Sequence, residues 1–134
     1  MPITPTTFAG HKTLSAANRY RAYADVYLTD PSTGVKSSTI QCLVDTGSDY
    51  TILPMSAATA IGLTPSGPPV TFRTVGGATH SLPSHSWVDI VIEGYHIIGP
   101  VVFAIATGFS PIVGRLELVQ AFDIGMNLTD WYYG

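Results

Sequence analysis

Charged residues are scarce in this chain of 134 residues. They make up 11% of it, with six basic and nine acidic side chains and a formal net charge of -3. The basic residues form no cluster that could neutralise a row of phosphates, so no nucleic acid is expected as a partner. A low charge also leaves much of the surface apolar or uncharged, and in a small domain such surface often forms a subunit contact. The composition therefore favours an oligomer before any motif is considered.

Cysteine is nearly absent as well. The single cysteine, Cys42, cannot form an internal disulfide, and its apolar neighbours Ile40 and Leu43 favour a buried, inert thiol. No segment reaches the roughly 18 apolar residues of a membrane span, and residues 1–7 lack the basic start and apolar run of a secretory signal. We therefore expect a protein without membrane contact that is cytoplasmic, or that is released from a larger precursor.

Apolar residues, in contrast, are plentiful. Hydrophobic residues make up 46% of the chain, which is typical of a packed globular unit, and the length fits a single domain. Residues 1–16 are polar, with proline and threonine, and predict a flexible N-terminal arm. No repeat, linker or low-complexity tract divides residues 17–134, so they are expected to form one domain.

The periodicity of the apolar residues indicates a β-rich fold. They alternate from Tyr20 to Leu28, and the turn residues 30–34 lead into a second strand, which completes a hairpin. A second, projecting hairpin is predicted around Gly76-Gly77, because both glycines can adopt positive φ in a two-residue turn. The predicted strands are 20–28, 35–44, 51–54, 70–75, 78–82, 87–92, 96–106 and 124–133.

Helical spacing is confined to short segments. Residues 55–61 have the composition of a brief helical turn that ends at Gly62. After Gly114 the apolar residues Leu116, Leu118, Val119 and Phe122 follow helical spacing, and this is the only full helix that the pattern predicts. The expected fold class is all-β with one short C-terminal helix.

An acidic residue follows the strand 35–44 directly. The sequence Asp45-Thr46-Gly47-Ser48 places a carboxyl group at the end of an apolar strand, next to two hydroxyls and a glycine. Burial disfavours the ionised form of such a group, whereas nearby amide and hydroxyl donors favour it, so the site suits proton transfer. Gly47 allows a sharp turn close to the acid, and Thr46 and Ser48 can donate to it or brace the loop.

Asp-Thr-Gly alone usually marks a surface turn, so its context decides its meaning. Downstream, Ile112-Val113-Gly114-Arg115 leads directly into the predicted helix, and the Gly76-Gly77 hairpin lies between the two motifs. This ordered set resembles the retropepsins, the single-domain aspartic peptidases that include the retroviral proteases. In that family an apolar pair precedes Asp-Thr-Gly, a glycine-rich flap hairpin follows, and an apolar-apolar-Gly-Arg segment opens the C-terminal helix.

The resemblance implies a closed β-barrel with a flap and a homodimer in which each subunit supplies one Asp45 to a catalytic dyad. It implies an endopeptidase that needs no metal or cofactor and cleaves extended peptides with apolar side chains beside the cut bond. The implied catalytic residues are Asp45, Thr46 and Gly47. The implied substrate-binding residues are Ser48, Asp49, Val75, Gly76, Gly77, Ile112 and Val113. Asp49 and Arg115 stand where the retroviral enzymes carry an ion pair at the base of the site.

Other interpretations stay open. The N- and C-terminal segments are longer than in a minimal retroviral protease, whose termini interleave in the dimer, so the interface is not predicted. The main competing hypothesis is a non-catalytic dimerisation or peptide-binding module on the same fold, because a fold alone does not establish activity. An unrelated β-barrel binding protein would leave the three-part pattern unexplained. The histidines show no metal-ligand spacing, and the serines show no nucleophile-elbow pattern.

Overall fold

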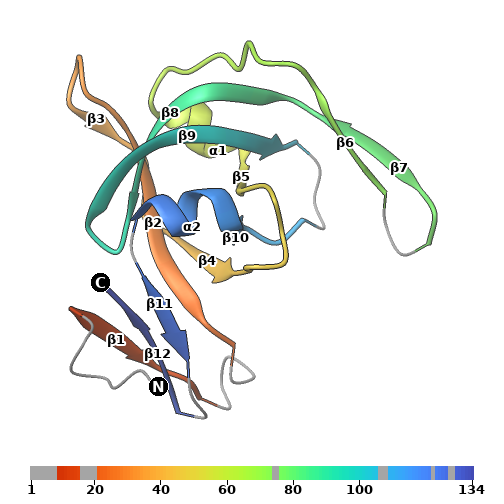
Figure 1. Cartoon of the computed structure of the whole chain (residues 1–134). Helices are drawn as coiled ribbons and strands as arrows, with labels where there is room; N and C mark the ends of the chain where they lie inside the picture. Colours follow the sequence, from red (N-terminus) through yellow and green to blue (C-terminus); the bar gives the residue numbers. More distant parts are fainter. Residues whose placement is uncertain (1–8, 16–20, 74–75, 106–108, 122, 127–128) are drawn as a thin grey trace.

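The computed structural model describes residues 9–15, 21–73, 76–105, 109–121, 123–126 and 129–134. Within them the fold is mostly β, with two short helices, α1 (Met55–Ala60) and α2 (Arg115–Ala121). Figure 1 shows the arrangement of the elements. The described strands are β1 (Gly10–Thr13), β2 (Tyr23–Asp30), β3 (Val35–Lys36), β4 (Ile40–Val44), β5 (Ile52–Pro54), β6 (Val70–Arg73), β7 (Thr79–Leu82), β8 (Ser84–Ile92), β9 (Tyr95–Ala104), β10 (Ile112–Val113), β11 (Ile124–Met126) and β12 (Asp130–Tyr133).

The main sheet closes on itself. Its described strands lie in the order β3-β2-β4-β10-β5-β9-β8, and the additional pairing of β2 with β8 closes a six-stranded barrel. Strand β2 shows why the sequence folds this way, because Ala24, Val26 and Leu28 alternate along it and are all fully buried. The expected all-β fold with a closed barrel is confirmed.

Two apolar clusters form the core. The larger one includes Phe103, Leu118 and Trp131, each fully buried, and the smaller one is built on Ile52, Leu82 and Val102. Cys42 is buried in the larger cluster, as expected, and burial raises the pKa of its thiol to about 12. A thiol that stays protonated at neutral pH is a poor nucleophile, so Cys42 acts as a core residue.

The hairpins match the expected strands with local differences. The predicted strand 35–44 is interrupted, because Ser37 turns inward: its hydroxyl accepts a hydrogen bond from the Leu28 N–H at 2.9 Å. The hairpin of β6 and β7 projects from the barrel (Figure 1), and its described pairs end at Arg73 and Thr79. Gly77 adopts positive φ there, at 84°.

Both helices lie in the segments where the sequence predicts helical structure. Helix α2 confirms the predicted C-terminal helix and packs against β9. Helix α1 is a second short helix, and it forms where the sequence predicted only a brief turn. Gly62 ends it with φ at 71°, and the Leu63 N–H returns to the Ala58 carbonyl at 2.9 Å. Neither helix in the described part of the chain has the length and apolar character needed to cross a membrane.

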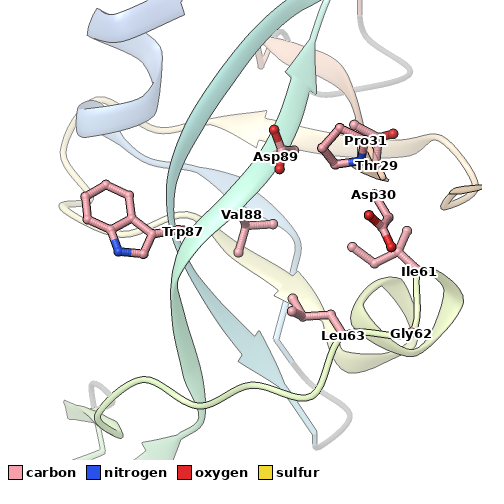
Figure 2. Close-up of a pocket in the computed structure, with 9 residues that line it drawn as sticks. All are labelled: Thr29, Asp30, Pro31, Ile61, Gly62, Leu63, Trp87, Val88 and Asp89. Carbon is pink, nitrogen blue, oxygen red and sulfur yellow. The ribbon is translucent and has the colours of Figure 1, made fainter. Parts of the chain in front are cut away.

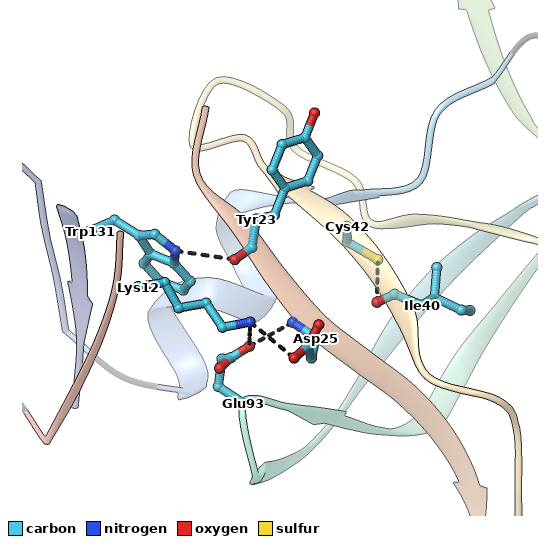
Figure 3. A network of polar contacts seen from close by, with 7 residues as sticks. All are labelled: Lys12, Tyr23, Asp25, Ile40, Cys42, Glu93 and Trp131. Carbon is cyan, nitrogen blue, oxygen red and sulfur yellow. Dashed lines mark hydrogen bonds and ion pairs between the residues drawn. The ribbon is translucent and has the colours of Figure 1, made fainter. Parts of the chain in front are cut away.

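The two ends of the chain meet in a separate three-stranded sheet in the order β1-β12-β11. Residues 10–13 therefore form a paired strand instead of belonging to the expected loose arm. Lys12 of β1 is fastened to the barrel, with Nζ 2.7 Å from the Glu93 carboxylate and 3.0 Å from that of Asp25 (Figure 3). Glu93 in turn accepts the Asp25 N–H at 2.6 Å, and the Trp131 indole donates to the Tyr23 carbonyl at 3.1 Å.

Candidate active site

The strand order places Asp45 at a fixed point of the barrel. Strand β10 pairs in parallel with β4 and antiparallel with β5, so it lies between these two strands. Residues 45–51, here called the Asp45 loop, connect β4 to β5 and must therefore pass around the end of β10. The segment after Asp45 and the segment 112–115, which are far apart in the sequence, are brought together by this pairing.

Backbone contacts hold Asp45 itself. Its N–H donates to the Val113 carbonyl at 3.0 Å, and its own carbonyl accepts the Ser48 N–H at 3.2 Å. Carboxylate atom Oδ1 accepts the Gly47 N–H at 3.0 Å. A Cβ atom at Gly47 would lie 3.3 Å from the same oxygen, so glycine permits this close approach. The half-buried carboxylate is thus oriented by the turn that its own motif forms.

The remaining residues of the loop brace it from within. The Ser48 hydroxyl donates to the Tyr50 carbonyl at 2.8 Å and accepts the Tyr50 N–H at 3.2 Å. The Ser48 carbonyl accepts the Arg115 N–H at 2.7 Å. Of the two roles considered for Ser48, the structure therefore shows the bracing one. Thr46 is exposed at the turn.

Asp49 and Arg115 form the ion pair that the resemblance implied. Arg115 Nη2 lies 2.7 Å from Asp49 Oδ1, and the two side chains are 67% (Asp49) and 55% (Arg115) exposed. An ion pair this exposed contributes between zero and about 1 kcal/mol, because water screens it. Within a single chain the pair therefore does little for stability, although it does tie the start of α2 to the Asp45 loop.

Gly114 is packed closely against the backbone of the Asp45 loop. A Cβ atom at Gly114 would lie 2.5 Å from both the carbonyl carbon and the carbonyl oxygen of Tyr50. Backbone atoms cannot move aside as a flexible side chain can, so only glycine fits between β10 and the Asp45 loop.

Gly114→Ala should therefore destabilise the fold, by about 1–3 kcal/mol in the free energy of unfolding, because it pushes the loop away from β10. Gly76→Ala is the matched control, since a Cβ atom there would have nothing within 4 Å and the φ of Gly76 is not positive. Urea unfolding of both variants measures the difference. Equal stability of the two would contradict the close packing described here.

The projecting hairpin reaches the Asp45 loop through an aromatic contact. The ring of Phe72 on β6 lies 5.5 Å from that of Tyr50, edge to face. Gly76 and Gly77 are exposed at the tip, and Val75 lies outside the described residues. Ile112 is half-buried against the smaller apolar cluster. Val113 is fully buried in the core, so its carbonyl supports Asp45 and its side chain does not line a surface pocket.

Two cavities of the structure lie away from Asp45. A cavity of about 220 Å³ lies between the β2–β3 turn, the end of α1 and β8 (Figure 2). A second cavity, of about 250 Å³, lies beside the terminal sheet, next to Lys12 and Trp131. Neither contains a residue of the Asp45 loop. The first cavity is lined by Thr29, Asp30, Pro31, Ile61, Gly62, Leu63, Trp87, Val88 and Asp89.

Sequence reasoning missed two buried polar residues, one at the end of the Asp45 loop and one beneath it. Thr51 is fully buried, and its hydroxyl accepts the Gly114 N–H at 3.0 Å. Glu117, in the first turn of α2, is also fully buried. The helical pattern could have placed Glu117 on the buried side, three residues after Gly114, but carboxylates are rarely buried, so its residue type favours an exposed position.

Comparison with known families agrees with this geometry. The model of the family described as "Aspartyl protease" matches residues 32–127, which is well over half of the chain and contains both the Asp45 loop and the segment 112–115. A search among curated proteins gave no match. The resemblance to the retropepsins is therefore confirmed at the level of the family. On this match, and with the barrel and the Asp-Thr-Gly turn in place, the chain belongs to the aspartyl protease family.

Proposed function

We propose that the protein is an aspartic endopeptidase that works as a homodimer, with one Asp45 from each subunit. The observation that carries the proposal is the Asp45 turn, in which the carboxylate is oriented by the Gly47 N–H and the backbone is fastened to Val113. A scaffold that only bound a peptide would not need an oriented carboxylate at this point.

The chemistry requires two carboxyls that share one proton. Aspartic-protease dyads are the standard example of such a pair. The ionised carboxylate takes a proton from water, whose oxygen attacks the carbonyl carbon of the scissile peptide bond. The protonated carboxyl polarises the carbonyl oxygen at the same time. When the tetrahedral intermediate collapses, the C–N bond breaks and one carboxyl gives a proton to the leaving nitrogen. The dyad, which had gained a proton from water, is then left with its single shared proton.

A second subunit supplies the missing carboxyl. The sequence contains one Asp-Thr-Gly and no Asp-Ser-Gly, so one chain cannot provide both members of the dyad. Thr46, Gly47 and Asp49 are exposed around Asp45, which leaves the loop open to a partner. A two-fold axis beside Asp45 is the simplest closed arrangement, because it brings the same loop from each subunit to the same place.

The substrate in this proposal is an extended peptide. The hairpin of β6 and β7 acts as the flap: it closes over the peptide, excludes water and offers backbone hydrogen bonds. Ile112, Phe72 and Phe109 pack against the smaller apolar cluster at this end of the barrel. They favour apolar side chains on either side of the cut bond.

The test is cleavage of a peptide library by the purified protein, with and without pepstatin, an inhibitor of aspartic peptidases. We expect cleavage within apolar-flanked segments, inhibition by pepstatin and no effect of a metal chelator. Binding of peptides without cleavage at any pH would instead favour the non-catalytic module.

The rate of cleavage should depend on pH as a bell-shaped curve with an acidic optimum. At low pH both dyad carboxyls are protonated and no base remains, whereas at high pH both are ionised and the shared proton is lost. Repulsion between the two charges also disfavours the dimer at high pH, so the alkaline fall should be steeper in dilute enzyme. Rates measured at two enzyme concentrations separate the two causes. A rate that rises steadily to pH 9 would contradict the carboxyl pair.

A further inference from the structure

Beneath the Asp45 loop lies a carboxyl group that the dyad mechanism does not use. Glu117 is fully buried, and neither of its carboxyl oxygens accepts a hydrogen bond of regular geometry from the described residues. Its side chain lies against the backbone of β9, where a Cβ atom at Gly99 would be 3.6 Å from Glu117 Oε1. An ionised carboxylate without partners is too costly to keep in such a place. We therefore expect the Glu117 carboxyl to be protonated, or to have a structural role that compensates for its burial.

The hydroxyl of Thr51 links this carboxyl to the site. Burial raises the pKa of Glu117, while the Thr51 hydroxyl and the backbone of Glu117 itself act in the opposite direction. The Thr51 oxygen already accepts the Gly114 N–H at 3.0 Å, so its own hydrogen remains available as a donor to Glu117. A donation from this hydrogen to Glu117 would orient the Thr51 lone pair toward Gly114.

Gly114 stands between two of the backbone contacts that hold the Asp45 loop. On one side the Val113 carbonyl accepts the Asp45 N–H, and on the other the Arg115 N–H donates to the Ser48 carbonyl. A shift of Gly114 would therefore move both ends of the turn that orients the carboxylate. Hydrogen bonds therefore connect Thr51 to Gly114, and the neighbours of Gly114 to the Asp45 loop, while Glu117 is buried three residues after Gly114.

We propose that Glu117 is a positioning residue, a buried carboxyl that accepts the Thr51 hydroxyl, holds Thr51 and Gly114 in place and so fixes the Asp45 loop for the peptidase reaction. The proposal rests on the proposed function, because the reaction is what the loop would be held for. It assigns Glu117 no contact with substrate.

The ionisable groups named here on the surrounding elements have partners of their own. Arg115 of α2 pairs with Asp49 of the loop, and His96 of β9 pairs with Asp89 of β8 at 2.9 Å. The side-chain amide nitrogen of Gln120, on the next turn of α2, lies near Gly99. The remaining acid of the loop is Asp45 itself. The proton on Glu117 can therefore be tested separately if Asp45 is first replaced.

The sign of the pH effect follows from the raised pKa. The folded chain holds the Glu117 proton more tightly than the unfolded chain, whose value is near the ordinary 4.5. Stability is therefore full below that pH and falls as the pH rises above it, until the folded-state pKa is passed. In an Asp45→Asn background we expect the unfolding temperature to fall over this window, by about 4 °C for each unit by which the pKa is raised. Adding Glu117→Gln should remove the fall.

The positioning role is tested with two substitutions at Glu117. Glu117→Gln still accepts the Thr51 hydrogen bond and should keep both activity and slow hydrogen exchange at the Gly114 N–H. Glu117→Leu fills a similar volume and should still fold, but it cannot accept the bond. It should lose kcat, by up to about a hundredfold, with little change in KM, and its Gly114 N–H should exchange faster. Gln120→Leu, at an exposed position of the same helix, is the control and should match the parent.

The outcomes separate this proposal from the proposed function. A parent protein that cleaves no peptide refutes the peptidase function, while hydrogen exchange at Gly114 still reports whether Glu117 holds the loop. Parental kcat and exchange in Glu117→Leu would overturn the positioning role. Equal losses in the Gln and Leu variants would overturn it as well, because they would show that a hydrogen-bond acceptor is not what matters. An unchanged pH dependence after Glu117→Gln would refute the neutral carboxyl.

Discussion

Asp45→Asn is expected to abolish peptide cleavage and leave the fold unchanged. An amide can neither take a proton from water nor share one with its partner, and in a homodimer both members of the dyad are lost together. We expect the rate to fall by about 10⁴-fold, the upper range for loss of general acid–base catalysis, or below detection. The asparagine side-chain oxygen can still accept the Gly47 N–H that Asp45 Oδ1 accepts at 3.0 Å, so the turn should persist.

The measurement is the rate of peptide cleavage together with circular dichroism and thermal unfolding of the same preparation. Asp123→Asn serves as the control, because Asp123 is an exposed acid between α2 and β11 and its substitution removes the same charge. Its rate should equal that of the parent. Peptidase activity that survives in Asp45→Asn would mean that the catalytic group lies elsewhere.

Dilution should reduce the activity faster than it reduces the protein concentration. If the site is completed only in the dimer, the concentration of active enzyme below the dissociation constant varies with the square of the total concentration. A tenfold dilution in that range should therefore lower the rate about a hundredfold. Sedimentation over the same range locates the dissociation constant independently. A rate strictly proportional to concentration while sedimentation shows monomer would contradict the two-chain site.

Mixing subunits provides a sharper form of this test. Equal amounts of the parent and Asp45→Asn, exchanged well above the dissociation constant, pair at random. Only pairs of two parent subunits have both carboxyls, so about a quarter of the activity of the same total amount of parent should remain. Independent monomeric sites would retain half. The difference between a quarter and a half does not depend on how tightly the dimer binds.

The parts of the candidate site that depend on neighbouring residues in the sequence were predictable. The residue order apolar strand, acid, hydroxyl, glycine indicated the Asp45 turn, and the structure gives Gly47 the close approach that this order predicted. The Asp49–Arg115 pair followed from the resemblance and is present at 2.7 Å. The substrate-binding roles of Gly76, Gly77, Ile112 and the other implied residues stay predictions, since they need a bound peptide to be tested.

The support beneath the site was not predictable in the same way. The helical spacing allows Glu117 a buried position, but carboxylates are rarely buried, so its residue type favours an exposed one. Its burial depends on how α2 packs on β9, and its relation to Thr51 depends on the position of β5. Similarly, residues 10–13 have no strong strand pattern. They form β1 because they pair with the edge of β12 and because Lys12 forms ion pairs with Asp25 and Glu93.

The sequence by itself therefore determined the features that depend on neighbours along the chain: the alternating strands, the two helical segments and the turn around Asp45. These follow from backbone sterics and from burial of one face, which act over a few residues. Only the tertiary structure decided that β10 lies between β4 and β5, that Gly114 meets Tyr50 and that Glu117 is buried behind the loop. The contacts of β10 and Gly114 join segments sixty or more residues apart, and their register is set by the packing of the whole barrel, which no local pattern encodes.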